Sequence, residues 1–171
     1  LMEQSCEGHW LFLIETDDRP GAAAALATVF SGRGIQIESF IGYGDPADSA
    51  GRDTGIIVIT FKAFRHRMEM VQRVLQRLEV VHSVDCRDYA DESLVKTATV
   101  SLVRWDESVE NLLRDFDLDL TSLREDTPHP LAILSGRPVE VDRAVSTLSE
   151  RAWLASATYA FLPPRPTVAE A

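Results

Sequence analysis

Apolar residues recur along the chain in two patterns, as runs of strand length and as stripes of helical spacing. Residues 10–14 (WLFLI) and 54–61 (TGIIVITF) are nearly continuous apolar runs, which is typical of strands buried in a sheet. Apolar residues spaced by three and four over residues 20–31 and 65–79 predict amphipathic helices. The first half of the chain therefore predicts strand, helix, strand, strand, helix, strand.

Right-handed strand–helix–strand crossovers turn this order into a split βαβ sheet with both helices on one face. The stretch from residue 42 to 55, rich in Gly, Asp and Ser, predicts a mobile loop between two strands. The expected elements of this half are strands over residues 9–16, 35–43, 54–61 and 80–87, and helices over residues 20–31 and 65–79.

The second half of the chain repeats the same plan. We expect strands over residues 97–103, 118–123, 131–135 and 153–162, and helices over residues 107–116 and 139–152. The predicted fold class is α+β, with two tandem ferredoxin-like βαββαβ domains, antiparallel sheets and helices on one face. Their expected bounds are residues 9–88 and 94–163, followed by an extended tail over residues 164–171, because prolines stop the last strand.

Composition excludes several classes of protein. The formal charge of −10 argues against nucleic acid or an anionic membrane as a partner, since either requires a basic face. No apolar run approaches the roughly 20 residues that cross a bilayer, and the chain starts without the pattern of a secretory signal. Cys6 and Cys86 have no metal-ligand spacing. We therefore expect a cytoplasmic protein with no metal, no membrane and no nucleic-acid partner.

The junction between the first strand and the first helix carries the strongest candidate chemistry. Asp17 and Asp18 end the strand and offer carboxylate caps, Pro20 suits a first helical turn, and Gly21 leaves the helix mouth without a side chain. Backbone N–H groups there favour a small anion such as an amino-acid carboxylate, and a nearby Asp suits its ammonium group. Ordinary helix capping is the alternative interpretation of the same residues.

Catalytic chemistry finds little support in the sequence. It contains no HExxH motif, no P-loop and no Gly-x-Ser-x-Gly. The histidines, at positions 9, 66, 82 and 129, lie far apart, and each is expected at the surface or satisfied by a neighbour. A small catalytic ferredoxin-like domain is the alternative from a different class. Four arginines on the outer face of the second helix predict a solvated face, with a partner-binding patch as the alternative: Arg65, Arg67, Arg73 and Arg77.

These features together resemble an ACT domain and, more narrowly, the small regulatory subunit of acetolactate (acetohydroxyacid) synthase. That family has a turn ending in Pro-Gly, here Pro20 and Gly21, and an Arg-Gly-aromatic-Asn-Ile-Glu-Ser-Leu stretch, here RGIQIESF at residues 33–40. The resemblance covers nearly the whole chain, is firm over residues 10–87 and continues through LVK at residues 94–96. Beyond residue 103 only the plan of elements supports it, and the second copy lacks the Pro-Gly turn.

The resemblance implies a non-catalytic regulatory subunit. Such a subunit binds and activates a thiamine-diphosphate-dependent acetolactate synthase catalytic subunit and confers feedback control by a branched-chain amino acid. It implies no cofactor in this chain, a valine-like amino-acid effector, and a homodimer through the ACT sheets that brings the turn of one subunit near Gln36 of the other. The implied effector-binding residues are Asp17, Asp18, Arg19, Pro20, Gly21, Ala22, Gln36 and Ile37.

Two positions depart from the family pattern. Asp18 stands where the family has Asn in the turn, and Gln36 stands where it has the Asn before Ile-Glu-Ser. Aspartate only accepts hydrogen bonds and repels a nearby carboxylate, and glutamine carries its amide one methylene further out. A stand-alone ACT amino-acid sensor, or a regulator of a different amino-acid biosynthetic enzyme, is therefore the alternative function.

Overall fold

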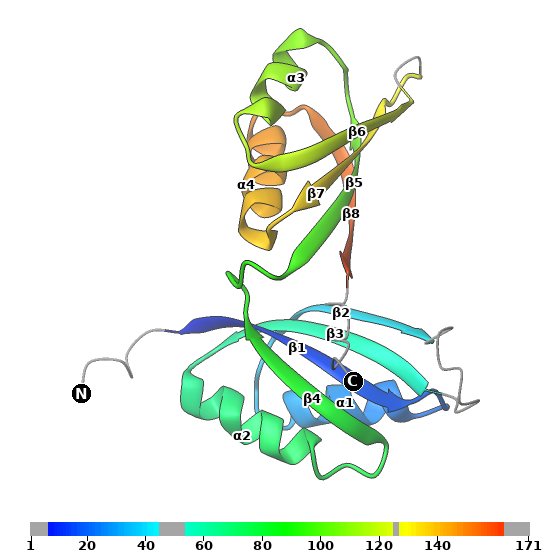
Figure 1. The fold of residues 1–171 in the computed structure, drawn as a ribbon, viewed down its shortest axis with the longest axis vertical. Coiled ribbons are helices and arrows are strands. Elements are labelled where there is room, and N and C mark those ends of the chain that lie inside the picture. Colours follow the sequence, from blue (N-terminus) through cyan, green and yellow to red (C-terminus); the bar gives the residue numbers. More distant parts are fainter. Residues whose placement is uncertain (1–6, 45–53, 125–126, 163–171) are drawn as a thin grey trace, which may run out of the picture. The chain divides into compact units, whose positions relative to one another are not determined.

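The computed structural model describes residues 7–44, 54–124 and 127–162. The chain divides into two compact units, Leu1–Tyr89 and Ala90–Ala171, each a sheet with two helices (Figure 1). Most of the loop expected over residues 42–55 and the tail expected over residues 164–171 lie outside the described residues, as does Cys6.

The first unit is a four-stranded antiparallel sheet with both helices on one face (Figure 1). Its strand order is β2-β3-β1-β4, so β2 and β4 form the edges. The order along the chain confirms the expected βαββαβ fold. The elements are β1 (Gly8–Asp17), α1 (Ala22–Ser31), β2 (Ile37–Gly44), β3 (Thr54–Ala63), α2 (Arg65–Leu75) and β4 (Val81–Asp88).

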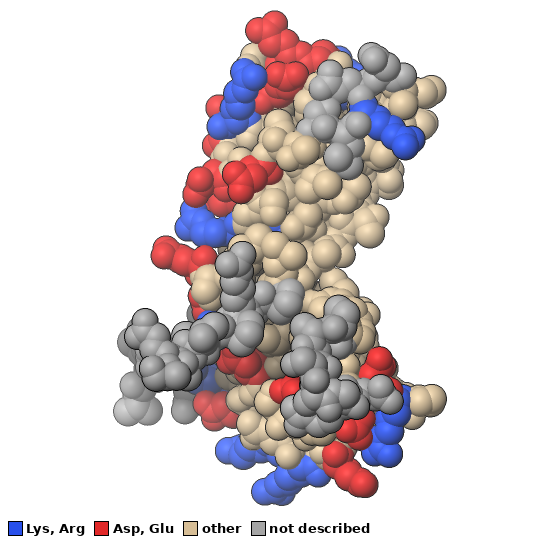
Figure 2. Space-filling view, turned by 45° about the vertical axis from the view of Figure 1, so that its right-hand side comes forward, with Lys and Arg blue, Asp and Glu red and all other residues tan. Residues whose placement is uncertain are grey.

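The second unit has the same topology, with the strand order β6-β7-β5-β8. Its elements are β5 (Val95–Leu102), α3 (Glu107–Arg114), β6 (Leu118–Arg124), β7 (Leu131–Gly136), α4 (Pro138–Glu150) and β8 (Leu154–Leu162). On the side turned away from α3 and α4, charged side chains are few (Figure 2). Small residues such as Thr97, Thr99 and Ser135 occupy that side of β5 and β7.

The core of the first unit lies between its sheet and its helices. Alternation along β1 places Phe12 on the helix side of the sheet, fully buried, where its ring packs edge-on against Phe61 at 4.9 Å and Phe30 at 6.2 Å. Edge-to-face geometry at these separations is favourable for aromatic rings. The stripe expected on the first helix is confirmed, because its apolar members are all buried: Ala22, Leu26, Val29 and Phe30.

In the first unit, two helix ends differ from the expectation. α1 begins at Ala22 rather than at residue 20, because Gly21 takes the N-cap position and leaves Pro20 outside the helix. α2 ends at Leu75 rather than at residue 79, because Leu78 N–H donates to the Leu75 carbonyl at 3.0 Å in a tighter turn. No helix in the described ranges is long and apolar enough to span a membrane.

Candidate functional site

The turn between β1 and α1 leaves the N-terminus of α1, called here the head of the helix, without a capping side chain. Gly21 has φ 94°, a left-handed conformation that glycine adopts without steric cost. A Cβ built on Gly21 meets no atom of the described residues within 4 Å, apart from its neighbours in the chain. The turn therefore presents its backbone rather than a side chain.

The first turn of α1 carries unused hydrogen-bond donors. Gly21 occupies the N-cap position of α1, so no side chain caps the helix, and the first turn contains no acidic residue. The Ala22 N–H donates to the Arg19 carbonyl at 3.2 Å, whereas the N–H groups of Ala23 and Ala24 have no acceptor among the described residues. Such donors, with the positive end of the helix dipole, suit a small carboxylate.

The expectation that Asp17 or Asp18 caps α1 is wrong, because both side chains turn elsewhere. The Asp17 carboxylate pairs with Arg19 Nε at 3.1 Å and with His82 Nε2 at 2.9 Å. The Asp17 N–H also donates to the Val80 carbonyl at 2.9 Å. Asp17 thus ties the turn to the start of β4.

Asp18 lies at the end of the sheet, beside two glycines. A Cβ built on Gly44 would be 2.9 Å from Asp18 Oδ2, and one built on Gly55 would be 3.6 Å from Asp18 Cβ. The Asp18 side chain is exposed and forms no ion pair within the part of the chain that the structure describes. No described residue therefore competes for this carboxylate with a cationic group at the N-terminus of α1.

Gln36 and Ile37 lie at the opposite end of the sheet. In the register of β2 and β3, Ile37 is opposite Phe61 whereas Gly44 is opposite Gly55, so the two ends of β2 are roughly 24 Å apart at about 3.4 Å per residue. The exposed Gln36 side chain donates from Nε2 to the Ile37 carbonyl at 3.0 Å. One chain alone does not bring Gln36 to the turn.

β2 is an edge strand, and α1 has a slim outer face. Within the described residues β2 pairs only with β3. Phe40 on this strand is 36% exposed, and burial raises the pKa of Tyr43.

The exposed side chains of α1 are small, namely Ala23, Ala24, Thr28 and Ser31.

Glu38, next to Ile37 in β2, lies in a cluster of charged side chains. Its carboxylate pairs with His9 Nε2 at 2.6 Å and with Lys62 Nζ at 3.0 Å. Desolvation by burial raises the pKa of Glu38, but the hydrogen bond from Lys62 and the charges of His9 and Lys62 together bring it below the usual value. This group ties β2 to β1 and β3.

The corresponding turn of the second unit is closed by its own side chain. Asp106 is the N-cap of α3, and its carboxylate accepts from Ser108 N–H at 3.0 Å and Val109 N–H at 3.2 Å. These are the donors that a ligand carboxylate would need. Only the first unit therefore has an open helix head at this position of the fold.

Comparison with known proteins shows the fold. The acetolactate synthase small subunit from Thermotoga maritima matches with a TM-score of 0.67 at 17% identity, over 94% of this chain and 99% of that chain. The chain has the fold of that small subunit. A ligand-free regulatory subunit of aspartate kinase from Thermus thermophilus has a TM-score of 0.44 at 17% identity, over 83% and 94% of the two chains. No protein-family model and no curated protein matches the sequence.

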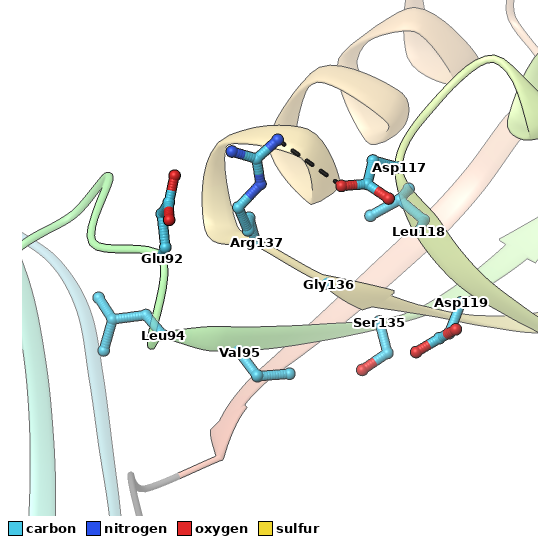
Figure 3. Close-up of a pocket in the computed structure, with 9 residues that line it drawn as sticks. All are labelled: Glu92, Leu94, Val95, Asp117, Leu118, Asp119, Ser135, Gly136 and Arg137. Atoms are coloured by element: carbon cyan, nitrogen blue, oxygen red, sulfur yellow. Dashed lines mark ion pairs between the residues drawn. The ribbon is translucent and has the colours of Figure 1, made fainter.

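The second unit carries a shallow pocket of its own, of about 280 Å³. Figure 3 shows Arg137 turned toward Asp117, with which it pairs at 3.7 Å, and Glu92 on the other side of Arg137. Asp117 is mostly exposed. No three His, Cys, Asp or Glu side chains of the described ranges are placed to hold a metal ion.

Several residues of the turn carry no local signal in the sequence. His82 holds Asp17 from 65 positions away, and Gly44 and Gly55 adjoin Asp18 from β2 and β3. Only the strand register could reveal them, because Thr16 and Gly55 are partners in β1 and β3.

Of the four arginines expected on a solvated face, three are exposed as expected, namely Arg65, Arg73 and Arg77. Arg67 differs, because it is half-buried and donates to the Arg33 carbonyl.

Proposed function

We propose that this chain is a non-catalytic regulatory subunit that binds and activates a thiamine-diphosphate-dependent acetolactate synthase catalytic subunit. The observation that carries the proposal is the fold, which matches an acetolactate synthase small subunit over nearly the full length of both chains. The open head of α1 adds a place for an effector in the first unit. The chain needs no cofactor of its own for this role.

The effector in this proposal is a branched-chain amino acid of valine type. Its carboxylate lies at the head of α1, where the N–H groups of Ala23 and Ala24 and the helix dipole favour an anion. Its ammonium group lies toward Asp18, which has no other cationic partner in the described ranges. The ammonium must lie between the two carboxylates, because Asp18 repels a carboxylate that approaches directly.

The proposed assembly is a homodimer that pairs β2 with β2 of a second copy. Unpaired edge strands favour such pairing, and the small outer face of α1 permits two helices to approach closely. A twofold axis runs the two β2 strands antiparallel, which sets the Gly44 end of one copy beside the Ile37 end of the other. The partner's Gln36 then reaches the Asp18–Gly21 turn and completes the pocket that one chain leaves open.

Feedback control follows from this shared pocket. An effector that contacts both copies stabilises one geometry of the dimer, and the catalytic subunit responds only as far as it distinguishes that geometry from the others. Asp18 and Gln36 differ from the family's amides and offer the effector different hydrogen bonds, so valine, leucine and isoleucine must each be tested. A stand-alone amino-acid sensor keeps the same pocket but has no catalytic partner.

The test is co-expression with an acetolactate synthase catalytic subunit, followed by an assay of acetolactate formation with and without valine, leucine and isoleucine. We expect the two chains to elute together, activity above that of the catalytic subunit alone, and inhibition by one of the three amino acids. The Gly21→Asp variant should keep the activation and lose the inhibition. Amino-acid binding without co-elution or activation would reject the enzyme partner and support the stand-alone sensor.

A further inference from the structure

We propose that the first unit binds a small aliphatic carboxylate in a second site, a pocket between Arg33 and Arg67. The pocket has a volume of about 210 Å³ and is lined by Arg33, Ile35, Arg67 and Met70. Arg33 belongs to the turn that follows α1, and Arg67 belongs to the first turn of α2. Both elements are part of one chain, so this site does not depend on a second copy.

Backbone carbonyls hold both guanidinium groups in place. Arg67 donates from Nη2 to the carbonyl of Arg33, and Arg33 donates from Nη1 to the carbonyl of Val29 at 3.2 Å. Each side chain is half-buried. The two cations are therefore positioned before any ligand arrives, which reduces the ordering cost of binding.

No carboxylate of the described residues neutralises the positive charge of this pair. Neither Arg33 nor Arg67 forms an ion pair with a carboxylate in the described part of the chain, although the chain as a whole has a formal charge of −10. Arg33 Nε is also buried and has no hydrogen-bond acceptor there. Buried polar groups normally have a partner, so this guanidinium keeps hydrogen-bonding capacity that no described residue uses.

The remaining walls select the kind of anion. Guanidinium groups bind carboxylates through paired N–H donors, while Ile35 and Met70 offer apolar surface to an aliphatic chain. The volume is below the roughly 300–1,000 Å³ of drug-sized pockets, which restricts the ligand to a short chain. Two cations repel an ammonium group, so an acid without a neighbouring amine is preferred over an amino acid.

This site is separate from the proposed effector site. Arg33 follows the C-terminal end of α1 and Gly21 caps its N-terminal end, about 15 Å away along a ten-residue helix. The two sites share no residue. Each can therefore fail or succeed without the other.

The test is a titration of isovalerate into the full chain. Binding is monitored by ¹⁵N NMR of the arginine Nε–H groups. Isovalerate is valine without its ammonium group, so valine and the neutral isovaleramide are matched controls. We expect isovalerate to shift the Arg33 and Arg67 signals saturably, and valine and isovaleramide to leave them in place. Gly21→Asp should not change this result.

Two variants locate the site. Arg67→Ala should weaken isovalerate binding about tenfold to a hundredfold, the loss expected for hydrogen bonds to a charged group. Met70→Glu, at a position 42% exposed, should abolish binding because its own carboxylate occupies the two arginines. Arg73→Ala, exposed on the same helix, is the control and should bind as the native chain does.

Three results would overturn the proposal. The first is the absence of a saturable shift with isovalerate, and the second is an equal shift in the Met70→Glu variant. The third is saturation by inorganic phosphate together with no response to isovalerate, since this would reject the carboxylate class. Thermal unfolding of each variant must match the native chain for its titration to be compared.

Discussion

The carboxylate of Asp18 lies against the backbone of Gly44, so close that a Cβ on Gly44 would be 2.9 Å from Asp18 Oδ2. Asp18 belongs to the turn after β1, and Gly44 ends the edge strand β2. This contact holds the acid that we assign to the effector ammonium at the edge where a second copy is proposed to pair. The position of one side chain therefore depends on a glycine 26 residues away.

Replacing Gly44 with alanine should move Asp18 without harming the fold. The clashing atom is the free end of an exposed side chain, so we expect the free energy of unfolding to change by less than about 0.5 kcal/mol. Amino-acid affinity should fall by about tenfold, as for one lost charge-assisted hydrogen bond. Calorimetric titration and thermal unfolding of the same sample measure both effects.

Gly42→Ala is the matched control on the same strand, because its Cβ would lie 3.5 Å from Ile57 Cγ1, an ordinary contact. It should leave the affinity as it is. An unchanged affinity in Gly44→Ala would show that Asp18 does not hold the effector.

The aromatic cluster of the first unit should dominate its stability. Phe12 is fully buried between Phe30 and Phe61, so Phe12→Ala should lower the free energy of unfolding by about 3–5 kcal/mol. Phe12→Leu should cost less, about 1–2 kcal/mol, because it preserves most of the volume. Urea denaturation measures both, with Met70→Ala at an exposed position as the control. Equal losses for the alanine and leucine variants would argue against tight packing at Phe12.

Cys86 should be an unreactive thiol at neutral pH. Burial, together with the nearby Asp85 carboxylate, raises the pKa of Cys86 to about 11. At pH 8 its thiolate fraction is therefore roughly a hundredfold or more below that of a free thiol with a pKa of about 8.5. In a Cys6→Ser variant, alkylation by iodoacetamide should be slow at pH 8 and accelerate up to pH 11. Alkylation as fast as that of glutathione would contradict this environment.

The ion pairs of Glu38 should make the free energy of unfolding depend on pH. The pKa of Glu38 is lowered in the folded state, so its contribution is present at neutral pH and is lost as the pH falls through the folded-state value. Solvent screening keeps the effect small, since the side chain is about a third exposed. Urea midpoints between pH 7 and pH 3 should fall less steeply in Glu38→Gln. Parallel profiles for the two proteins would refute the contribution.

Apolar periodicity was sufficient to predict the fold, because each element depends on its own residues. Both sheets bury the strand runs that the pattern marks, and Leu26 and Phe30 face the core as their spacing predicts. The prediction that the second half of the chain repeats the fold was also correct, since its order of elements is the same as that of the first half. Helix ends were less accurate, because capping at Gly21 and the tight turn after Leu75 depend on local backbone geometry.

The site was harder to predict, because its contacts join distant positions. Asp17 was expected to cap α1 but pairs with His82, and Asp18 lies beside Gly44 instead. Arg67 was placed on a solvated face, yet its acceptor is the Arg33 carbonyl, 34 residues earlier. Turn composition identified the open helix head, whereas the partners of its side chains needed the strand register.

The measurement that tests the central claim most directly is calorimetric titration of valine, leucine and isoleucine into the native chain and into Gly21→Asp. We predict saturable binding of at least one of them to the native chain. We also predict its loss in the variant, because a carboxylate at the head of α1 takes the place of the effector's own. Thermal unfolding should show that the variant is folded. The absence of binding by all three amino acids, or an unchanged titration in Gly21→Asp, would contradict the account.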